Sequence, residues 1–242
     1  MNDHELAAQL AQDAGRILLE IRESGRHHGK ALGDAGDGEA NAVLMAALRR
    51  LRPGDGLLSE EERDNPARLA RNRVWIVDPL DGTREYREGR SDWAVHVGLA
   101  VNGAASVGAV ALPALGLVLR SDRPVDRPPP PTRPRMVVSR TRPPAEALAV
   151  ADKLGADLVP MGSAGAKAMA VVRGQAEIYL HSGGQHQWDN CAPAAVALAQ
   201  GLHCSRIDGA PLVYNGADTL VPDLLICLPE YAERAIAGAR GA

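Results

Sequence analysis

A proline-rich stretch near the middle of the chain limits how the chain can fold. It reads "DRPVDRPPPPTRPR" from Asp122 to Arg135, and its four consecutive prolines favour extended polyproline II over helix or sheet. The helix and strand patterns before this stretch differ from those after it. We therefore expect a first half over residues 1–121, a linker over residues 122–134 and a second half over residues 135–242.

The first half has the pattern of two helices followed by a largely antiparallel sheet. Apolar residues recur at helical intervals from Leu6 to Ile21. A glycine-rich stretch, "GKALGDAGDGEAN", follows, and a second helix is expected to begin near Gly38. "GLLS" and "RVWIVD" indicate short strands, and Asn102-Gly103 between two Val-rich stretches indicates a hairpin.

The second half alternates strands with helices. We expect strands in "RMVVSR", "ADLVPM" and "AEIYL", and a final strand in "HCSRIDG". We expect helices in "PPAEALAVADKLG", "SAGAKAMAVVRG" and "WDNCAPAAVALAQG". The fold class is therefore α/β, with an α+β first half.

Composition excludes several classes of protein. The net charge is -3, so no broad basic surface indicates a nucleic-acid polymer or an anionic membrane as partner. No apolar run approaches the roughly 18 residues of a membrane span, and the N-terminus is unlike a signal peptide. The 3 cysteines include no C-x-x-C pair, which favours reduced thiols and a cytoplasmic location. Phe is absent, so the core must be aliphatic.

Five acidic residues are candidate metal ligands or catalytic groups: Asp37, Glu60, Asp78, Asp81 and Asp189. Taken singly, each has a simpler interpretation as a helix cap, a turn or a solvated charge. Taken together, acids that follow apolar segments could converge at one end of a sheet. Carboxylate oxygens suit magnesium, and two such ions could clamp a phosphoryl group against an attacking water.

The stretch "DPLDGT" is the densest of these acidic features. Asp78 and Asp81 are expected in one tight turn that Pro79 stiffens, and Gly82 would let the backbone approach a ligand closely. With "SEE" before it and "WD" far downstream, the chain resembles the inositol monophosphatase superfamily over nearly its whole length. "GSAGAKAMAVVRGQAEIYL" and "WDNCAPAAVALAQG" resemble most the bacterial 3'(2'),5'-bisphosphate nucleotidase branch.

This resemblance implies a layered α/β/α/β/α sandwich with metal ions at the seam between the halves. It implies that Glu60, Asp78 and the carbonyl of Leu80 hold a first magnesium ion, and that Asp78, Asp81 and Asp189 hold a second. Asp37 matches an acid near a third, weaker metal. The loop before it, "KALGDAGD", is shorter than the family pattern, and Asp34 is a second candidate there.

The resemblance also implies roles in catalysis and substrate binding. Thr83, assisted by Glu60, would orient and deprotonate the attacking water, and the N–H groups of Gly82 and Thr83 would meet the phosphate at a helix start. Gly162 and Ser163 would line the substrate site, where Lys167 could reach a phosphate, next to Asp81 and Asp189. Ser163 could instead be a plain N-cap, and Lys167 an exposed helical lysine.

Four residues near Asp189 have mainly structural interpretations. His181 and His186 could line the substrate pocket, but we expect them in a polar loop. Trp188 is expected in packing rather than as a platform for stacking a base, and Cys191 as a small buried residue rather than a thiol open to reagents. Pro193 replaces the glycine of many relatives, and we expect it in the first turn of its helix, where its missing N–H costs little.

The expected function is a lithium-sensitive, magnesium-dependent phosphomonoesterase that removes the 3'-phosphate of 3'-phosphoadenosine 5'-phosphate, and also acts on its sulfated form, in sulfate assimilation. Inositol-1-monophosphatase or fructose-1,6-bisphosphatase activity is the alternative, and a non-catalytic ligand sensor is a third interpretation. Its partner would be a small phosphate ester, and the protein a monomer or homodimer.

Overall fold

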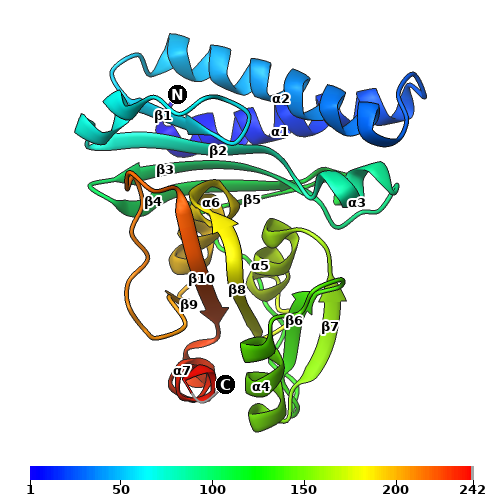
Figure 1. The fold of residues 1–242 in the computed structure, drawn as a ribbon, viewed down its shortest axis with the longest axis vertical. Coiled ribbons are helices and arrows are strands. Elements are labelled where there is room, and N and C mark those ends of the chain that lie inside the picture. Colours follow the sequence, from blue (N-terminus) through cyan, green and yellow to red (C-terminus); the bar gives the residue numbers. More distant parts are fainter. Residues whose placement is uncertain (241–242) are drawn as a thin grey trace.

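The computed structural model describes residues 1–240 as five layers, in the order helices, sheet, helices, sheet, helices. Helices α1 (Asp3–Glu23) and α2 (Gly29–Leu51) cover the outer face of the first sheet (Figure 1). Helices α5 (Ala164–Val172) and α6 (Gln187–Ala199) lie between the two sheets. The expected α/β/α/β/α sandwich is thus confirmed.

The first sheet has the strand order β1-β2-β3-β4-β5. Strand β1 runs parallel to β2, and the other neighbours are antiparallel, as the sequence predicted for most of this half. A short helix, α3 (Thr83–Arg87), follows β2 directly. The strands are β1 (Gly56–Ser59), β2 (Arg73–Asp81), β3 (Ala94–Val101), β4 (Ala104–Leu112) and β5 (Leu117–Arg120).

The second sheet has the strand order β7-β6-β8-β10-β9 and mixes parallel with antiparallel pairs. Helices α4 (Ala145–Leu154) and α7 (Ala232–Ala239) pack together on its outer side (Figure 1). The strands are β6 (Arg135–Ser139), β7 (Asp157–Met161), β8 (Ile178–His186), β9 (His203–Ser205) and β10 (Leu220–Cys227).

Residues 121–134 carry no helix or strand and connect the two sheets. The position of this segment supports the division into residues 1–121 and 135–242, which stays a proposal. The stretch "HCSRIDG" was expected to be the final strand, but it forms only the short edge strand β9. Strand β10 and helix α7, which follow it in the chain, were not predicted.

The predicted start of the second helix was wrong. Helix α2 begins at Gly29, nine residues before Gly38, and the glycine-rich stretch is helical. Gly33 faces α3, where an added Cβ would lie 2.7 Å from the Cγ2 of Thr83. Tertiary packing therefore favours glycine here despite its poor helix propensity, because only a bare backbone allows this approach.

The core is largely aliphatic, as the absence of Phe predicted. Apolar side chains of α1 and α2 pack on the first sheet, and a second cluster fills the space around α5 and α6. The largest fully buried side chains include Trp75, Tyr86 and Trp93, all in the first half. This packing makes β2 and β3 a rigid base for the polar residues at their ends.

Candidate metal centre and active site

Three aspartates from two distant segments meet at the seam between the halves. Asp78 and Asp81 come from the end of β2, and Asp189 comes from the first turn of α6. One carboxylate oxygen of each lies within 4.8 Å of those of the other two. Asp78 and Asp81 are buried and Asp189 is half-buried. Among the described residues, no lysine or arginine forms an ion pair with any of the three.

The local backbone differs from the predicted tight turn. Strand β2 continues through Asp81, but its pairing with β3 shifts register between Asp78 and Asp81. The N–H of Leu80 donates to Oδ1 of Asp78 at 3.0 Å within this irregular segment. The turn comes at Gly82, whose φ is 90°. Such bulges re-aim side chains, which explains how two acids three residues apart serve one cluster.

The cluster carries unbalanced negative charge. Burial, followed by the charges of Glu60, Asp81 and Asp189, raises the pKa of Asp78 well above its ordinary value. Burial and the charge of Asp81 raise the pKa of Asp189 to about 6. Buried carboxylates without cationic partners are the donor set that a hard divalent cation requires. The residues present therefore fit a metal ion.

Asp81 is the exception, because its carboxylate is well supported. Burial alone would raise its pKa, but the charge of His96, the N–H of Gly165 and Lys167 together lower it. Oδ2 lies 3.2 Å from Nε2 of His96, and the N–H groups of Ala164 and Gly165 donate to the carboxylate at 3.2 Å and 2.6 Å. Asp81 therefore ties β2 to the start of α5.

His96 is a site residue that the sequence interpretation missed. It lies fully buried in β3, and its Nδ1 is 2.9 Å from the carbonyl oxygen of Trp188. Burial alone would lower its pKa, but the charge of Asp81 raises it above the ordinary value. The available signal was a lone histidine in the otherwise apolar stretch "WAVHVGLAV".

Glu60 lies beside the cluster, outside the set of three. It follows β1 with an exposed side chain, and its N–H donates to the carbonyl of Val77 at 3.3 Å. Although the residue as a whole is exposed, its carboxylate lies against Asp78, and desolvation there, followed by the charge of Asp189, raises its pKa to about 7. Its influence on Asp78 shows that the two carboxylates face the same space.

The side chains of Asp37 and Thr83 meet where α2 and α3 pack together. The hydroxyl of Thr83 donates to the carbonyl of Leu80 at 3.2 Å, and it also favours the ionised form of Asp37. Burial, followed by the charge of Glu61, raises the pKa of Asp37 to about 7. Asp34, the alternative candidate, instead pairs on the surface with Lys30 at 2.7 Å. Asp37 lies inside α2 and caps no helix.

A cleft of about 590 Å³ opens beside the cluster. The residues predicted to bind substrate line it, with the exception of Thr83; they are Asp81, Gly82, Gly162, Ser163, Lys167 and Asp189. Arg142, Glu146 and His181 line the part of the cleft formed by the second half.

Lys167 is not an exposed helical lysine. Its ammonium is buried and donates to the carbonyl oxygens of Gly162 and of Ser163, at 2.7 Å for the latter. Burial lowers its pKa to about 8, although the nearby carboxylates oppose this shift. Ser163 is the N-cap of α5, and its hydroxyl accepts from the N–H of Ala166 at 3.0 Å. Both residues thus shape the cleft wall.

The segment around Asp189 required two corrections. His181 and His186 lie in strand β8 and not in a polar loop, because β8 stays paired with β10 as far as His186. Pro193 lies in the second turn of α6, because the helix begins at Gln187. The predictions for Trp188 and Cys191 were confirmed, since both pack in one apolar cluster.

Known proteins match this chain over nearly its whole length. The model of the inositol monophosphatase family matches residues 3–125 and 132–240. A protein of Mycobacterium leprae named 3'-phosphoadenosine 5'-phosphate phosphatase is 50% identical over 247 residues, which cover 96% of this chain and 91% of that protein. The Escherichia coli K12 protein named 3'(2'),5'-bisphosphate nucleotidase CysQ is 29% identical, covering 88% and 94% of the two chains.

Solved structures share the fold. Inositol monophosphatase II of Staphylococcus aureus superimposes with a TM-score of 0.82 at 18% identity, over 99% of this chain and 96% of that one. CysQ of Bacteroides thetaiotaomicron gives a TM-score of 0.78 at 24% identity, over 93% and 97%. At these identities the likeness shows the fold alone.

Proposed function

The chain belongs to the inositol monophosphatase family, and on that premise we propose that it hydrolyses the 3'-phosphate of 3'-phosphoadenosine 5'-phosphate. The observation that carries this conclusion is the 50% identity, over 96% of the chain, with a protein named for that activity. The resemblance predicted from "SEE", "DPLDGT" and "WD" is confirmed, and so is the prediction of a phosphatase.

We propose magnesium as the cofactor, bound as two ions, on the support of the aspartate cluster. Glu60, Asp78 and the carbonyl of Leu80 would hold one ion, and Asp78, Asp81 and Asp189 the other. The bound cations would supply positive charge to phosphoryl oxygens and to the leaving oxygen. The raised pKa of Asp78 supports this proposal, because neighbouring carboxylates contribute to it and no lysine or arginine of the described residues pairs with Asp78.

The residues of the chain would position the ester and the attacking water. Thr83, assisted by Glu60, would orient the water, and its hydroxyl would take up the water's proton while passing its own proton to the carboxylate of Asp37. The N–H groups of Gly82 and Thr83 begin α3 and would face the phosphate. Because these groups come from a strand end and a helix start packed on the core, they are positioned before substrate arrives.

The rest of the proposed biology follows from this substrate. The partner would be a small phosphate ester held in the cleft beside the cluster. In the described residues, no helix has the length and apolar character that a membrane crossing needs. A cytoplasmic location, a role in sulfate assimilation, and a monomeric or homodimeric state stay proposals.

A substrate comparison tests the function. Phosphate release from 3'-phosphoadenosine 5'-phosphate, inositol 1-phosphate and fructose 1,6-bisphosphate is measured at one magnesium concentration. We expect kcat/KM for the nucleotide to exceed the others by at least about tenfold, the scale on which pocket contacts discriminate. Equal specificity constants would remove the nucleotidase assignment. No release from any ester would favour the ligand-sensor alternative.

A further inference from the structure

His96 touches two of the segments that carry the aspartate cluster. Its Nε2 lies 3.2 Å from Oδ2 of Asp81, at the end of β2. Its Nδ1 lies 2.9 Å from the carbonyl oxygen of Trp188, the residue that precedes Asp189 in α6. One imidazole of β3 therefore connects the end of β2 with the start of α6, two segments that are far apart in sequence.

The ring has no room to move. His96 is 0% exposed, and an added Cβ at Gly165 would lie 2.0 Å from its Nε2. The N–H of Gly165 donates to the same Asp81 carboxylate at 2.6 Å. The carboxylate of Asp81 therefore lies between the imidazole of His96 and the first turn of α5, and contacts both.

A purely structural histidine would have both ring nitrogens satisfied elsewhere. Here Nδ1 has the Trp188 carbonyl, but Nε2 has no well-aligned hydrogen bond among the described residues, and its only close partner is Asp81. Burying an imidazole nitrogen without a partner costs free energy, so an apolar side chain would serve packing better at this position. The contact with Asp81 gives the histidine a reason to be there.

We propose that His96 is a positioning residue, which holds Asp81 directly and Asp189 through Trp188 at the spacing that a divalent cation requires. Groups that contact metal ligands from behind commonly fix the orientation of those ligands. The inference rests on the proposed function, because it takes the aspartate cluster as a cation site.

Two conservative substitutions separate the two contacts. His96→Gln can place an amide nitrogen near the position of Nε2 and keep the Asp81 contact. His96→Asn reaches only as far as Nδ1 and keeps the Trp188 contact. His96→Leu removes both contacts, while the leucine side chain still fills the buried space. Mg²⁺ binding to the metal-free proteins is measured by titration calorimetry, and thermal unfolding is followed in parallel.

We expect His96→Leu and His96→Asn to weaken Mg²⁺ affinity by about 10–100-fold, the usual cost of losing a group behind a metal ligand. His96→Gln should recover most of this affinity. Turnover of His96→Asn should rise again as Mg²⁺ is increased, because the ligands remain and only their placement is loosened.

Leu99→Ala provides the control, because Leu99 is equally buried in β3 but belongs to the core under α1. It should lower the melting temperature without changing Mg²⁺ affinity. Wild-type affinity in His96→Leu, or equal weakening in His96→Gln and His96→Leu, would overturn the positioning role. Wild-type protein that binds no Mg²⁺ would instead overturn the proposed function itself, and this inference with it.

Discussion

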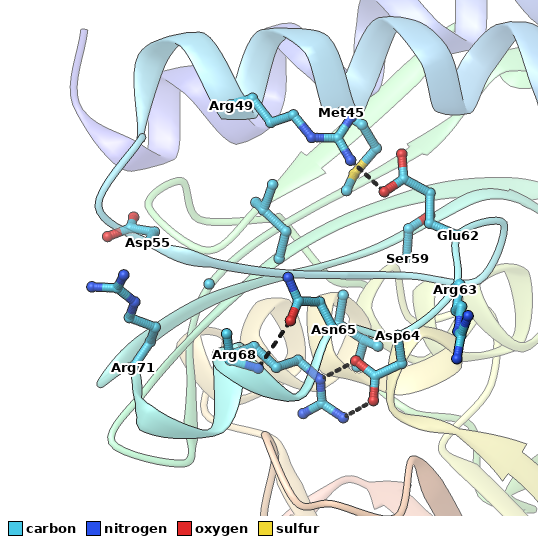
Figure 2. A pocket seen from close by; sticks show the side chains of 14 residues that line it. Met45, Arg49, Asp55, Ser59, Glu62, Arg63, Asp64, Asn65, Arg68 and Arg71 are labelled. Carbon is cyan, nitrogen blue, oxygen red and sulfur yellow. Dashed lines mark hydrogen bonds and ion pairs between the residues drawn. The ribbon is translucent and has the colours of Figure 1, made fainter.

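Carboxylates crowd two regions of this molecule, and only one region supplies arginines for them. The first region, which we call the arginine pocket, is a cavity of about 220 Å³ between α2, β1 and the segment after β1. There Asp64 accepts from Arg68 at 2.6 Å and 2.8 Å, and Glu62 pairs with Arg49 (Figure 2). The second region is the aspartate cluster, which has no such partners among the described residues.

The pKa shifts of the two regions run in opposite directions. Hydrogen bonds from Arg68 lower the pKa of Asp64, whereas burial and neighbouring carboxylates raise the pKa of Asp78. Arginines therefore balance the acids of the arginine pocket, whereas the acids of the aspartate cluster form a set of ligands that could hold a cation. The contrast favours the aspartate cluster as the functional region, although charged side chains also line the arginine pocket.

Removal of a cluster carboxylate should have the largest effect. Asp78→Asn should reduce turnover by about 10³-fold, the scale of losing one transition-state contact in phosphoryl or acyl transfer. Folding should survive, because the amide oxygen can still accept from the N–H of Leu80. Steady-state kinetics and circular dichroism measure the two effects. Near-normal turnover would show that the cluster is not the active site.

Removal of a buried arginine should instead affect stability. The side chain of Arg68 is 1% exposed and also donates to Asn215 and Gly216, so Arg68→Met should cost about 3 kcal/mol of unfolding free energy. Arg71→Met, on the exposed rim of the same pocket, is the matched control. Urea unfolding measures both, and Mg²⁺ affinity should remain at the wild-type value in each.

Cation binding should increase the free energy of unfolding by slightly less than the amount that Arg68→Met removes. A ligand that binds only the folded state at 100 times its Kd adds about 2.7 kcal/mol. Mg²⁺ should therefore raise the melting temperature of the wild type but not that of Asp78→Asn, in calorimetric scans with chelator as the reference. The same rise in both proteins would place the binding elsewhere.

The smallest effect should appear in the metal-free protein. Asp78→Asn removes one of several mutually repelling buried carboxylates, so it should stabilise the metal-free form by about 1 kcal/mol. Substitutions that remove such repulsion at a functional site commonly give gains of this size. Asp64→Asn should do the reverse, because it removes the partner of Arg68. Urea unfolding in chelator measures both. A loss of stability in both variants would show that the carboxylates of both regions stabilise the metal-free fold, which contradicts the proposed contrast.

Much of this protein was predictable from local pattern. The apolar run in "RVWIVD" and the Val-rich hairpin around Asn102-Gly103 predicted β2, β3 and β4, and "DPLDGT" with "WD" identified the family. Three of the acids chosen from these motifs, Asp78, Asp81 and Asp189, do meet in space. Hydrophobic periodicity and short motifs are local properties, so a single sequence is sufficient to recognise them.

Other features depended on contacts between distant residues. Residues 29–37 are helical in a place where Gly33 fits closely against Thr83, and the extension of β8 to His186 follows from its pairing with β10. His96 looked like one residue of an apolar strand until β2 and α6 were placed on either side of it. The sequence by itself determined which residues could do the chemistry. Only the tertiary structure decided which of them are left without a balancing charge, because ion pairing and burial depend on distances that no local pattern contains.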